Sequence, residues 1–138
     1  MTRTRVYVAF DYDDVSVKGD LIAQARRADC PFQLDDCSIE KPIRTHWAVE
    51  AERKITTADY VLVLCGEQTH QAGGASTELQ IAQKLGKRCI FVAGTRGGVP
   101  TAPVGTPSGT RIWTWTWAVV ADLLADRTPP ALAVRRIV

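Results

Sequence analysis

Acidic side chains cluster directly after the first apolar segment of the chain. The run Val6-Tyr7-Val8-Ala9-Phe10 is followed by Asp11, and then by Asp13 and Asp14. Closely spaced carboxylates suit metal binding or general acid–base catalysis. Aspartate also favours turns and helix N-caps, and this structural interpretation is the better one for Asp13 and Asp14. The cap of the helix that follows is expected at Asp14 or Ser16. For Asp11, which directly follows the apolar segment, both interpretations stay open.

Glu78 is a second candidate for chemistry. The sequence predicts a helix from about residue 76 to residue 85, with Glu78 in its first turn. An acid in that turn gains about 0.3–1 kcal/mol from the helix dipole, which is a purely structural reason for its presence. However, Glu78 shares a helical face with Ile81 and Ala82, so its carboxyl should face apolar surroundings. A partly desolvated carboxyl has a raised pKa or engages a polar ligand, which makes Glu78 a candidate functional residue.

A serine, two histidines and a tryptophan complete the candidates: Ser38, His46, Trp47 and His70. A serine and a histidine suggest a nucleophile, but no G-x-S-x-G elbow surrounds Ser38. We expect both histidines in loops or facing solvent. Trp47 should lie in the core or at the rim of a ligand pocket, and it is included among the substrate-binding candidates. The absence of a P-loop and of G-x-G-x-x-G after the first strand excludes kinase-like and Rossmann dehydrogenase functions.

The four cysteines do not indicate a metal centre. No C-x-x-C pair occurs, and no cysteine–histidine cluster has the spacing of a zinc site, so no metal is expected. Cys65 and Cys89 lie in apolar runs, where a free thiol behaves as a small hydrophobic group.

The elements that must position these residues alternate between strand and helix. Strands are expected at about 5–10, 32–34, 60–65, 88–93 and 111–113, and helices at about 14–29, 45–54, 76–85 and 117–124. This alternation predicts an α/β fold with a central parallel five-stranded sheet and helices on both faces. Ligands bind such sheets at the carboxyl ends of the strands, which selects the loops at 11–16, 35–44 and 66–76.

Composition predicts one globular domain spanning residues 1–138, with an undetermined tail at 129–138. The chain is 46% hydrophobic and has a formal net charge of +2. No apolar run approaches the roughly 20 residues of a membrane span, and the first residues do not resemble a secretory signal, so a cytoplasmic protein is expected. Residues 1–70 carry a net charge of −3 and residues 71–138 carry +5. No basic cluster indicates nucleic-acid binding, but the basic half could receive a ligand that bears phosphate.

Four segments occur in an order that is typical of a known family: Val8-Ala9-Phe10-Asp11-Tyr12-Asp13-Asp14, Asp36-Cys37-Ser38-Ile39-Glu40-Lys41-Pro42, Val63-Leu64-Cys65-Gly66-Glu67-Gln68-Thr69 and Glu78-Leu79-Gln80-Ile81-Ala82-Gln83-Lys84-Leu85-Gly86-Lys87. The series resembles the TIR-like domain family of the bacterial Thoeris antiphage defence system. The resemblance covers about residues 4–95, and the remainder of the chain is generic.

The resemblance implies a flavodoxin-like TIR fold and an NAD nucleosidase or ADP-ribosyl cyclase activity. NAD would be a substrate rather than a cofactor. Its nicotinamide is released, and an ADP-ribose-derived nucleotide, commonly a cyclic isomer, signals to a separate effector in antiviral defence. Glu78 matches the essential glutamate of the family, whereas Phe10, Asp11 and Ser38 match loops that line the substrate pocket. Self-association into a homo-oligomer is a further expectation.

The sequence also departs from the family pattern. Family members often carry tryptophan at the positions of Gly74 and Thr77, and again at that of Cys37. An altered ligand preference, or a non-catalytic scaffolding module, is therefore an alternative. A third alternative is a nucleoside deoxyribosyltransferase-like enzyme, which has a similar fold and a glutamate nucleophile.

Overall fold

Six strands form one sheet in the computed structural model, which describes residues 5–11, 14–28, 30, 33–34, 47–94, 98–129 and 133–137. The strands are β1 (Arg5–Ala9), β2 (Gln33–Leu34), β3 (Tyr60–Cys65), β4 (Arg88–Ala93), β5 (Arg111–Thr114) and β6 (Arg135–Arg136). The helices are α1 (Val15–Ala25), α2 (Trp47–Thr57), α3 (Gly73–Lys84) and α4 (Trp117–Leu124), with a 3-10 turn, η2, at Thr69–Gln71.

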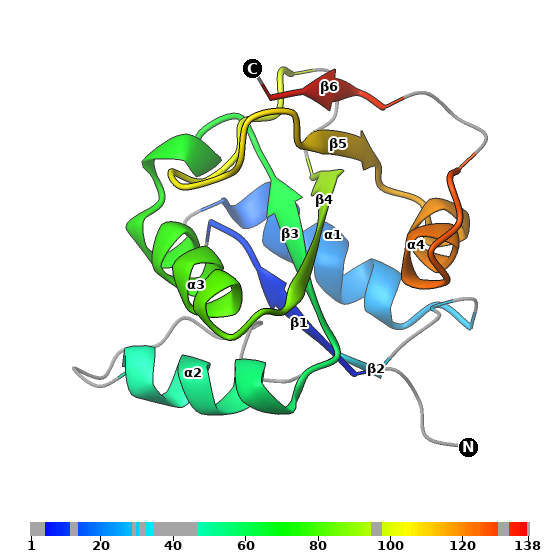
Figure 1. Ribbon diagram of the computed structural model, residues 1–138. Coiled ribbons are helices and arrows are strands. Elements are labelled where there is room, and N and C mark those ends of the chain that lie inside the picture. Colours follow the sequence, from blue (N-terminus) through cyan, green and yellow to red (C-terminus); the bar gives the residue numbers. More distant parts are fainter. Residues whose placement is uncertain are drawn as a thin grey trace.

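The sheet has the order β2-β1-β3-β4-β5-β6 (Figure 1). The first five strands are parallel, as the sequence predicts, and their order is compatible with a flavodoxin-like fold. The C-terminal tail adds a strand that the sequence does not predict, because β6 pairs antiparallel with β5. This pairing shows that part of the tail docks on the sheet.

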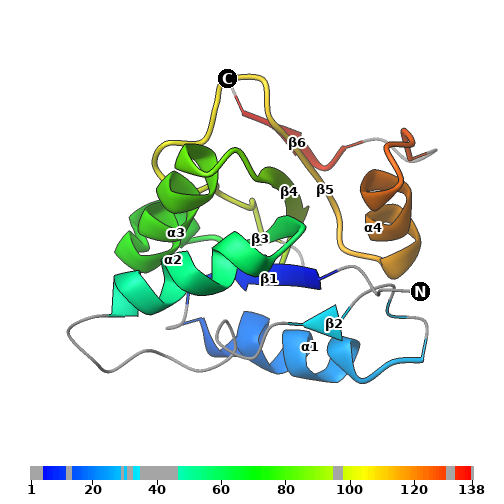
Figure 2. The same ribbon diagram turned by 60° about the horizontal axis from the view of Figure 1, so that its bottom comes forward.

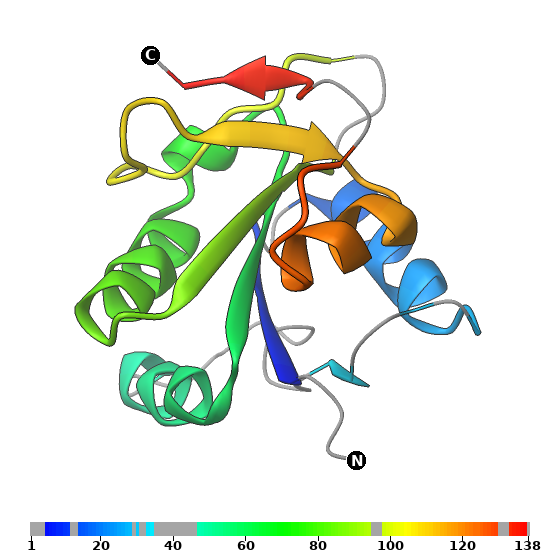
Figure 3. The same ribbon diagram turned by 45° about the vertical axis from the view of Figure 1, so that its right-hand side comes forward.

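Helices cover both faces of the sheet, which confirms the predicted layering. Strand alternation sends Val6 and Val8 toward one hydrophobic cluster and Tyr7 and Ala9 toward the other. Helices α1 and α4 pack on the first face, and α2 and α3 pack on the second. Figure 3 shows the sheet between these two layers, and Figures 1 and 2 show α2 and α3 side by side.

One long-range hydrogen bond joins the two helices of the first layer. The indole Nε1 of Trp117, at the start of α4, donates to the carbonyl of Gln24 near the end of α1 at 2.9 Å. The Trp117 side chain is 4% exposed, so this bond satisfies a buried donor within the apolar layer. The last helix is therefore fixed to α1 by packing and by a polar contact.

Helix α3 begins earlier than the sequence predicts, and this changes the position of Glu78. Gly73 and Gly74 were expected in a loop, but the helix starts at Gly73. The helical pattern is already formed there, because Ser76 N–H donates to the Ala72 carbonyl at 3.1 Å. Glu78 consequently lies in the second turn, where the helix dipole gives an acid little stabilisation. The prediction of a first-turn glutamate is wrong.

In the part of the chain that the structure describes, no helix has both the length and the apolar character needed to cross a membrane.

Candidate functional site

Glu78 is fully buried on the face of α3 that packs against the sheet. Its exposed fraction is 0%, and it is the one buried Asp, Glu, Lys or Arg among the described residues. Leu79 and Ala82, which follow Glu78 by one and four residues on α3, belong to the apolar cluster between α2, α3 and the sheet. The predicted apolar surroundings of this carboxyl are therefore confirmed. Burying such a group is costly unless hydrogen bonds compensate for lost water.

Tyr7 supplies one such compensation. The Tyr7 hydroxyl donates a hydrogen bond to Oε2 of Glu78, and the Tyr7 side chain is 1% exposed. The bond joins the second turn of α3 to the middle of β1, across the apolar layer. It fixes one carboxyl oxygen and gives the carboxyl a defined orientation. Sequence reasoning missed Tyr7, although a tyrosine in an otherwise aliphatic strand was a usable signal.

The acidic turn after β1 lies at the carboxyl end of the sheet and is built as a helix start. Oδ1 of Asp14 accepts from Val17 N–H at 3.1 Å, and Asp14 N–H donates to the Asp11 carbonyl at 2.9 Å. Asp14 is thus the N-cap of α1, as the structural interpretation of the sequence predicted. Asp11 is half-buried beside it, and Asp13 lies outside the described residues.

Gly66, the first residue after β3, brings a second loop against this acidic turn. A Cβ built on Gly66 would lie 2.6 Å from Oδ2 of Asp14, so any larger residue would displace the Asp14 carboxyl, whereas glycine leaves room for it. Gly66 N–H also donates to Oγ1 of Thr69 at 2.7 Å, and Thr69 is buried. Because β1 and β3 are neighbours where the strand order reverses, these loops meet at the edge where flavodoxin-like sheets bind ligands.

Thr101 holds the same edge from the loop that follows β4. Its hydroxyl lies 3.1 Å from the Gly66 carbonyl and 3.2 Å from the Glu67 carbonyl. It also accepts from His70 N–H at 3.0 Å, and its oxygen lies 2.9 Å from His70 Nδ1. His70 is solvent-exposed, as predicted. Its ring contributes to loop structure through the contact with Thr101. Thr101 gave no signal in the sequence because its partners lie more than thirty residues away.

The predicted site residues do not all come together. Phe10 is 0% exposed and belongs to the cluster on the α1 and α4 face, whereas Glu78 lies on the opposite face. Ser38 lies outside the described residues, as does the side chain of Trp47, whose backbone begins α2. The structure brings the Asp14 side chain to the Gly66 backbone and joins Glu78 to Tyr7.

The described residues contain no group of three or more His, Cys, Asp or Glu side chains arranged to hold a metal ion. Burial raises the pKa of the Cys65 thiol from 9.0 to about 12, an effect that the charge of Arg135 partly opposes. Burial likewise raises the pKa of Cys89 to about 11. Both thiols therefore stay protonated near neutral pH, which fits structural rather than nucleophilic roles.

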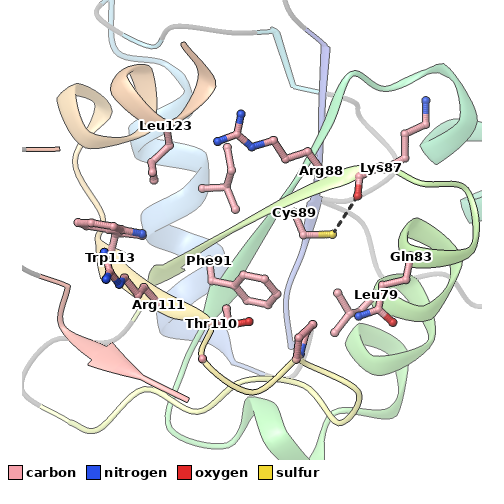
Figure 4. A pocket seen from close by; sticks show the side chains of 13 residues that line it. Leu79, Gln83, Lys87, Arg88, Cys89, Phe91, Thr110, Arg111, Trp113 and Leu123 are labelled. Carbon is pink, nitrogen blue, oxygen red and sulfur yellow. Dashed lines mark hydrogen bonds between the residues drawn. The ribbon is translucent and has the colours of Figure 1, made fainter. Parts of the chain in front are cut away.

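A pocket of about 470 Å³ lies at the opposite end of the sheet, around the first residues of β4 and β5 (Figure 4). Its lining includes Arg88 and Cys89 from β4, Arg111 from β5 and Gln83 from the last turn of α3. It is separate from the loops that follow β1 and β3, because parallel strands place their amino and carboxyl ends at opposite edges of the sheet. The sequence gave no indication of it.

No protein-family model matches the chain, and no curated protein matches it significantly.

Proposed function

We propose that the protein is a TIR-like NAD-cleaving enzyme that releases nicotinamide and makes an ADP-ribose-derived signalling nucleotide in antiviral defence. The observation that carries this proposal is the Glu78 carboxyl, buried on α3 and oriented by the Tyr7 hydroxyl. The resemblance of residues 4–95 to the Thoeris TIR-like family, and a strand order compatible with that fold, also support it. NAD is the substrate, the enzyme is cytoplasmic, and a separate effector receives the signal.

The proposed chemistry needs a fixed carboxylate near the ribose. The bond between C1′ of the ribose and the nicotinamide nitrogen breaks, and its electron pair leaves with neutral nicotinamide. Positive, oxocarbenium-like charge then develops on the ribose, as in glycoside hydrolysis. Glu78 stabilises that charge and orients the ribose hydroxyls, while Tyr7 restricts the carboxyl to one orientation. Water completes hydrolysis, whereas attack by a nucleophilic atom of the same ADP-ribose gives the cyclic product.

Substrate access places a condition on this mechanism. Glu78 has no exposed surface, so the ribose reaches it only after neighbouring side chains move. We expect such a rearrangement to accompany an infection signal or self-association into a homo-oligomer. The rate per protomer should then rise with protein concentration.

The test compares Glu78→Gln with the wild type. Glutamine keeps the size of the side chain and removes its charge, so we expect nicotinamide release to disappear while the circular dichroism spectrum is retained. Release is measured by chromatography after incubation with NAD at several protein concentrations. Glu67→Gln is the control, because Glu67 is an exposed acid on the loop after β3. Equal turnover by Glu78→Gln and the wild type contradicts the assignment.

One observation favours a second function, a non-catalytic scaffolding module. A glutamate that has no exposed surface and bonds to a core tyrosine is also what a purely structural acid looks like. Calorimetric titration with NAD and with ADP-ribose separates the two functions. Binding of either nucleotide that Glu78→Gln weakens supports the enzyme, whereas binding that this variant leaves unchanged, or no binding at millimolar ligand, supports the scaffold.

A further inference from the structure

The pocket at the amino ends of β4 and β5 exists because these neighbouring strands are staggered. The first residue pair between them is Phe91 with Ile112, although β4 begins three residues earlier at Arg88. The early part of β4 therefore has β3 on one side and the pocket on the other. Pro107, Gly109 and Thr110, which precede β5, line the pocket as well.

Strand alternation divides the pocket lining into two chemically different parts. Ile90 and Trp113 belong to the cluster on the α1 and α4 face, so Arg88 and Arg111, two residues from them along the strands, share that face. Phe91 belongs to the cluster on the other face. We call the first part the cationic side and define it by the pocket residues Arg88, Ile90, Arg111, Trp113 and Leu123.

The neutral side is the uncharged part of the lining near α3, defined by Leu79, Gln83, Cys89, Phe91, Pro107 and Thr110; Lys87, which directly precedes β4, is assigned to neither side. Figure 4 shows Leu79 and Gln83 on one side of the pocket and Arg111, Trp113 and Leu123 on the other. The neutral side combines apolar side chains with the uncharged polar groups of Gln83 and Thr110, and both arginines of the pocket lie on the cationic side.

The pocket has a positive field with one available guanidinium. Its lining contains Lys87, Arg88 and Arg111 and no acidic residue. Lys87 Nζ donates to the Thr56 carbonyl at 3.0 Å, and Arg88 forms an ion pair with the exposed Asp126. Arg111 is exposed and makes no side-chain hydrogen bond or ion pair with the described residues. Its planar fork suits bidentate binding of phosphate or carboxylate.

We propose that this pocket binds a small anion that carries a flat ring, with the anionic group on Arg111 and the ring against Cys89, Pro107 and Thr110, the solvent-accessible part of the neutral side. A volume of about 470 Å³ lies within the usual range for small-molecule sites. Apolar walls with a few placed polar groups are also usual in such sites. A mononucleotide and an aromatic carboxylate both satisfy this chemistry. The proposal is independent of NAD cleavage, because it concerns other residues at the other end of the sheet.

Calorimetric titration of the full chain tests the proposal with four probes: AMP, adenosine, inorganic phosphate and indole-3-carboxylate. We expect AMP or indole-3-carboxylate to bind more tightly than adenosine or phosphate alone, because only the first two combine a ring with an anion. The tighter of the two identifies the anionic group. Binding by none of the four at millimolar concentration overturns the proposal, as does phosphate binding as tightly as AMP.

Substitutions locate the bound anion. Arg111→Gln should weaken binding of the tighter probe by about tenfold, which corresponds to about 1.4 kcal/mol. Arg53→Gln is the matched control, since Arg53 is exposed on α2, outside the pocket lining, and its loss changes the net charge equally. Equal weakening by both variants shows a general field effect and overturns the assignment. Cys89→Leu, which fills the neutral side, should weaken binding of the ring-bearing probes without affecting binding of phosphate.

Discussion

The hydrogen bond between Tyr7 and Glu78 gives the sharpest prediction about this structure. Tyr7→Phe removes one hydroxyl from a fully packed layer and leaves the ring in place. Both side chains are at most 1% exposed, so water cannot replace the lost donor without rearrangement. A buried acceptor that loses its donor costs about 1–3 kcal/mol, and more if the acceptor is charged. We therefore expect Tyr7→Phe to lower the free energy of unfolding by about 2 kcal/mol.

A second tyrosine provides a matched control. The Tyr60 hydroxyl donates to the Leu124 carbonyl at 3.1 Å in a half-buried position on the opposite face of the sheet. Solvent reaches that carbonyl more easily, so Tyr60→Phe should cost about 0.5–1 kcal/mol. Urea unfolding followed by tryptophan fluorescence measures both variants. With a slope of roughly 2 kcal/mol per molar urea, Tyr7→Phe should shift the midpoint by about 1 M.

A double-mutant cycle then tests the pairing itself. Glu78→Met replaces the carboxyl with an apolar group of similar length, so the combination with Tyr7→Phe removes both partners. Removing both polar groups together is less costly than removing one, and the coupling should be about 1 kcal/mol or more. Additive effects, or a Tyr7→Phe cost no larger than that of Tyr60→Phe, would refute the buried hydrogen bond.

Three further predictions concern a contact between two loops, helix α1 and the core. Gly66→Ala forces the Asp14 carboxyl away from its capping position, so it should lower the free energy of unfolding by about 1 kcal/mol. In an Asp14→Ala background, where the cap is already lost, this cost should largely vanish. Additive costs of the two substitutions in urea unfolding would contradict the prediction. Gly19→Ala should stabilise by about 0.5–1 kcal/mol, because Gly19 is exposed within α1 and a Cβ there meets nothing within 4 Å; a lower melting temperature would contradict it. Because burial raises the pKa of Cys65 from 9.0 to about 12, its stabilising contribution is complete below pH 9 and is lost as the pH rises toward 12. Between about pH 8 and pH 10 the wild type should lose about 1 kcal/mol more than Cys65→Ala, and equal losses would exclude a buried, protonated thiol.

Much of the fold was predictable because its signals are local. The strand expected at 60–65 has the observed bounds of β3, since a continuous apolar run between polar neighbours leaves few alternatives. The Asp14 cap of α1 likewise follows from residue types within a few positions. The start of α3 was not predictable in this way. Glycine favours loops by its own propensity, yet Gly73 and Gly74 are helical in the context of this fold.

The site depended more strongly on tertiary structure. Helical spacing alone placed Glu78 on an apolar face, and its complete burial agrees with that. Its partner Tyr7 lies 71 residues away in the sequence, and no periodic pattern connects them. Phe10 and Glu78 were expected to serve one pocket, but alternation along β1 and the packing of α3 put them on opposite faces of the sheet.

The amino-acid sequence by itself determined which segments are buried strands, which are amphipathic helices, and that one carboxyl faces the core. These properties depend on neighbours a few residues away, so spacing and residue type are sufficient to predict them. Only the tertiary structure decided the Tyr7–Glu78 bond, the approach of Gly66 to Asp14, and the stagger that opens the pocket at the amino ends of β4 and β5. Each of these depends on the register and packing of segments that are far apart in the chain, and local patterns leave both undetermined.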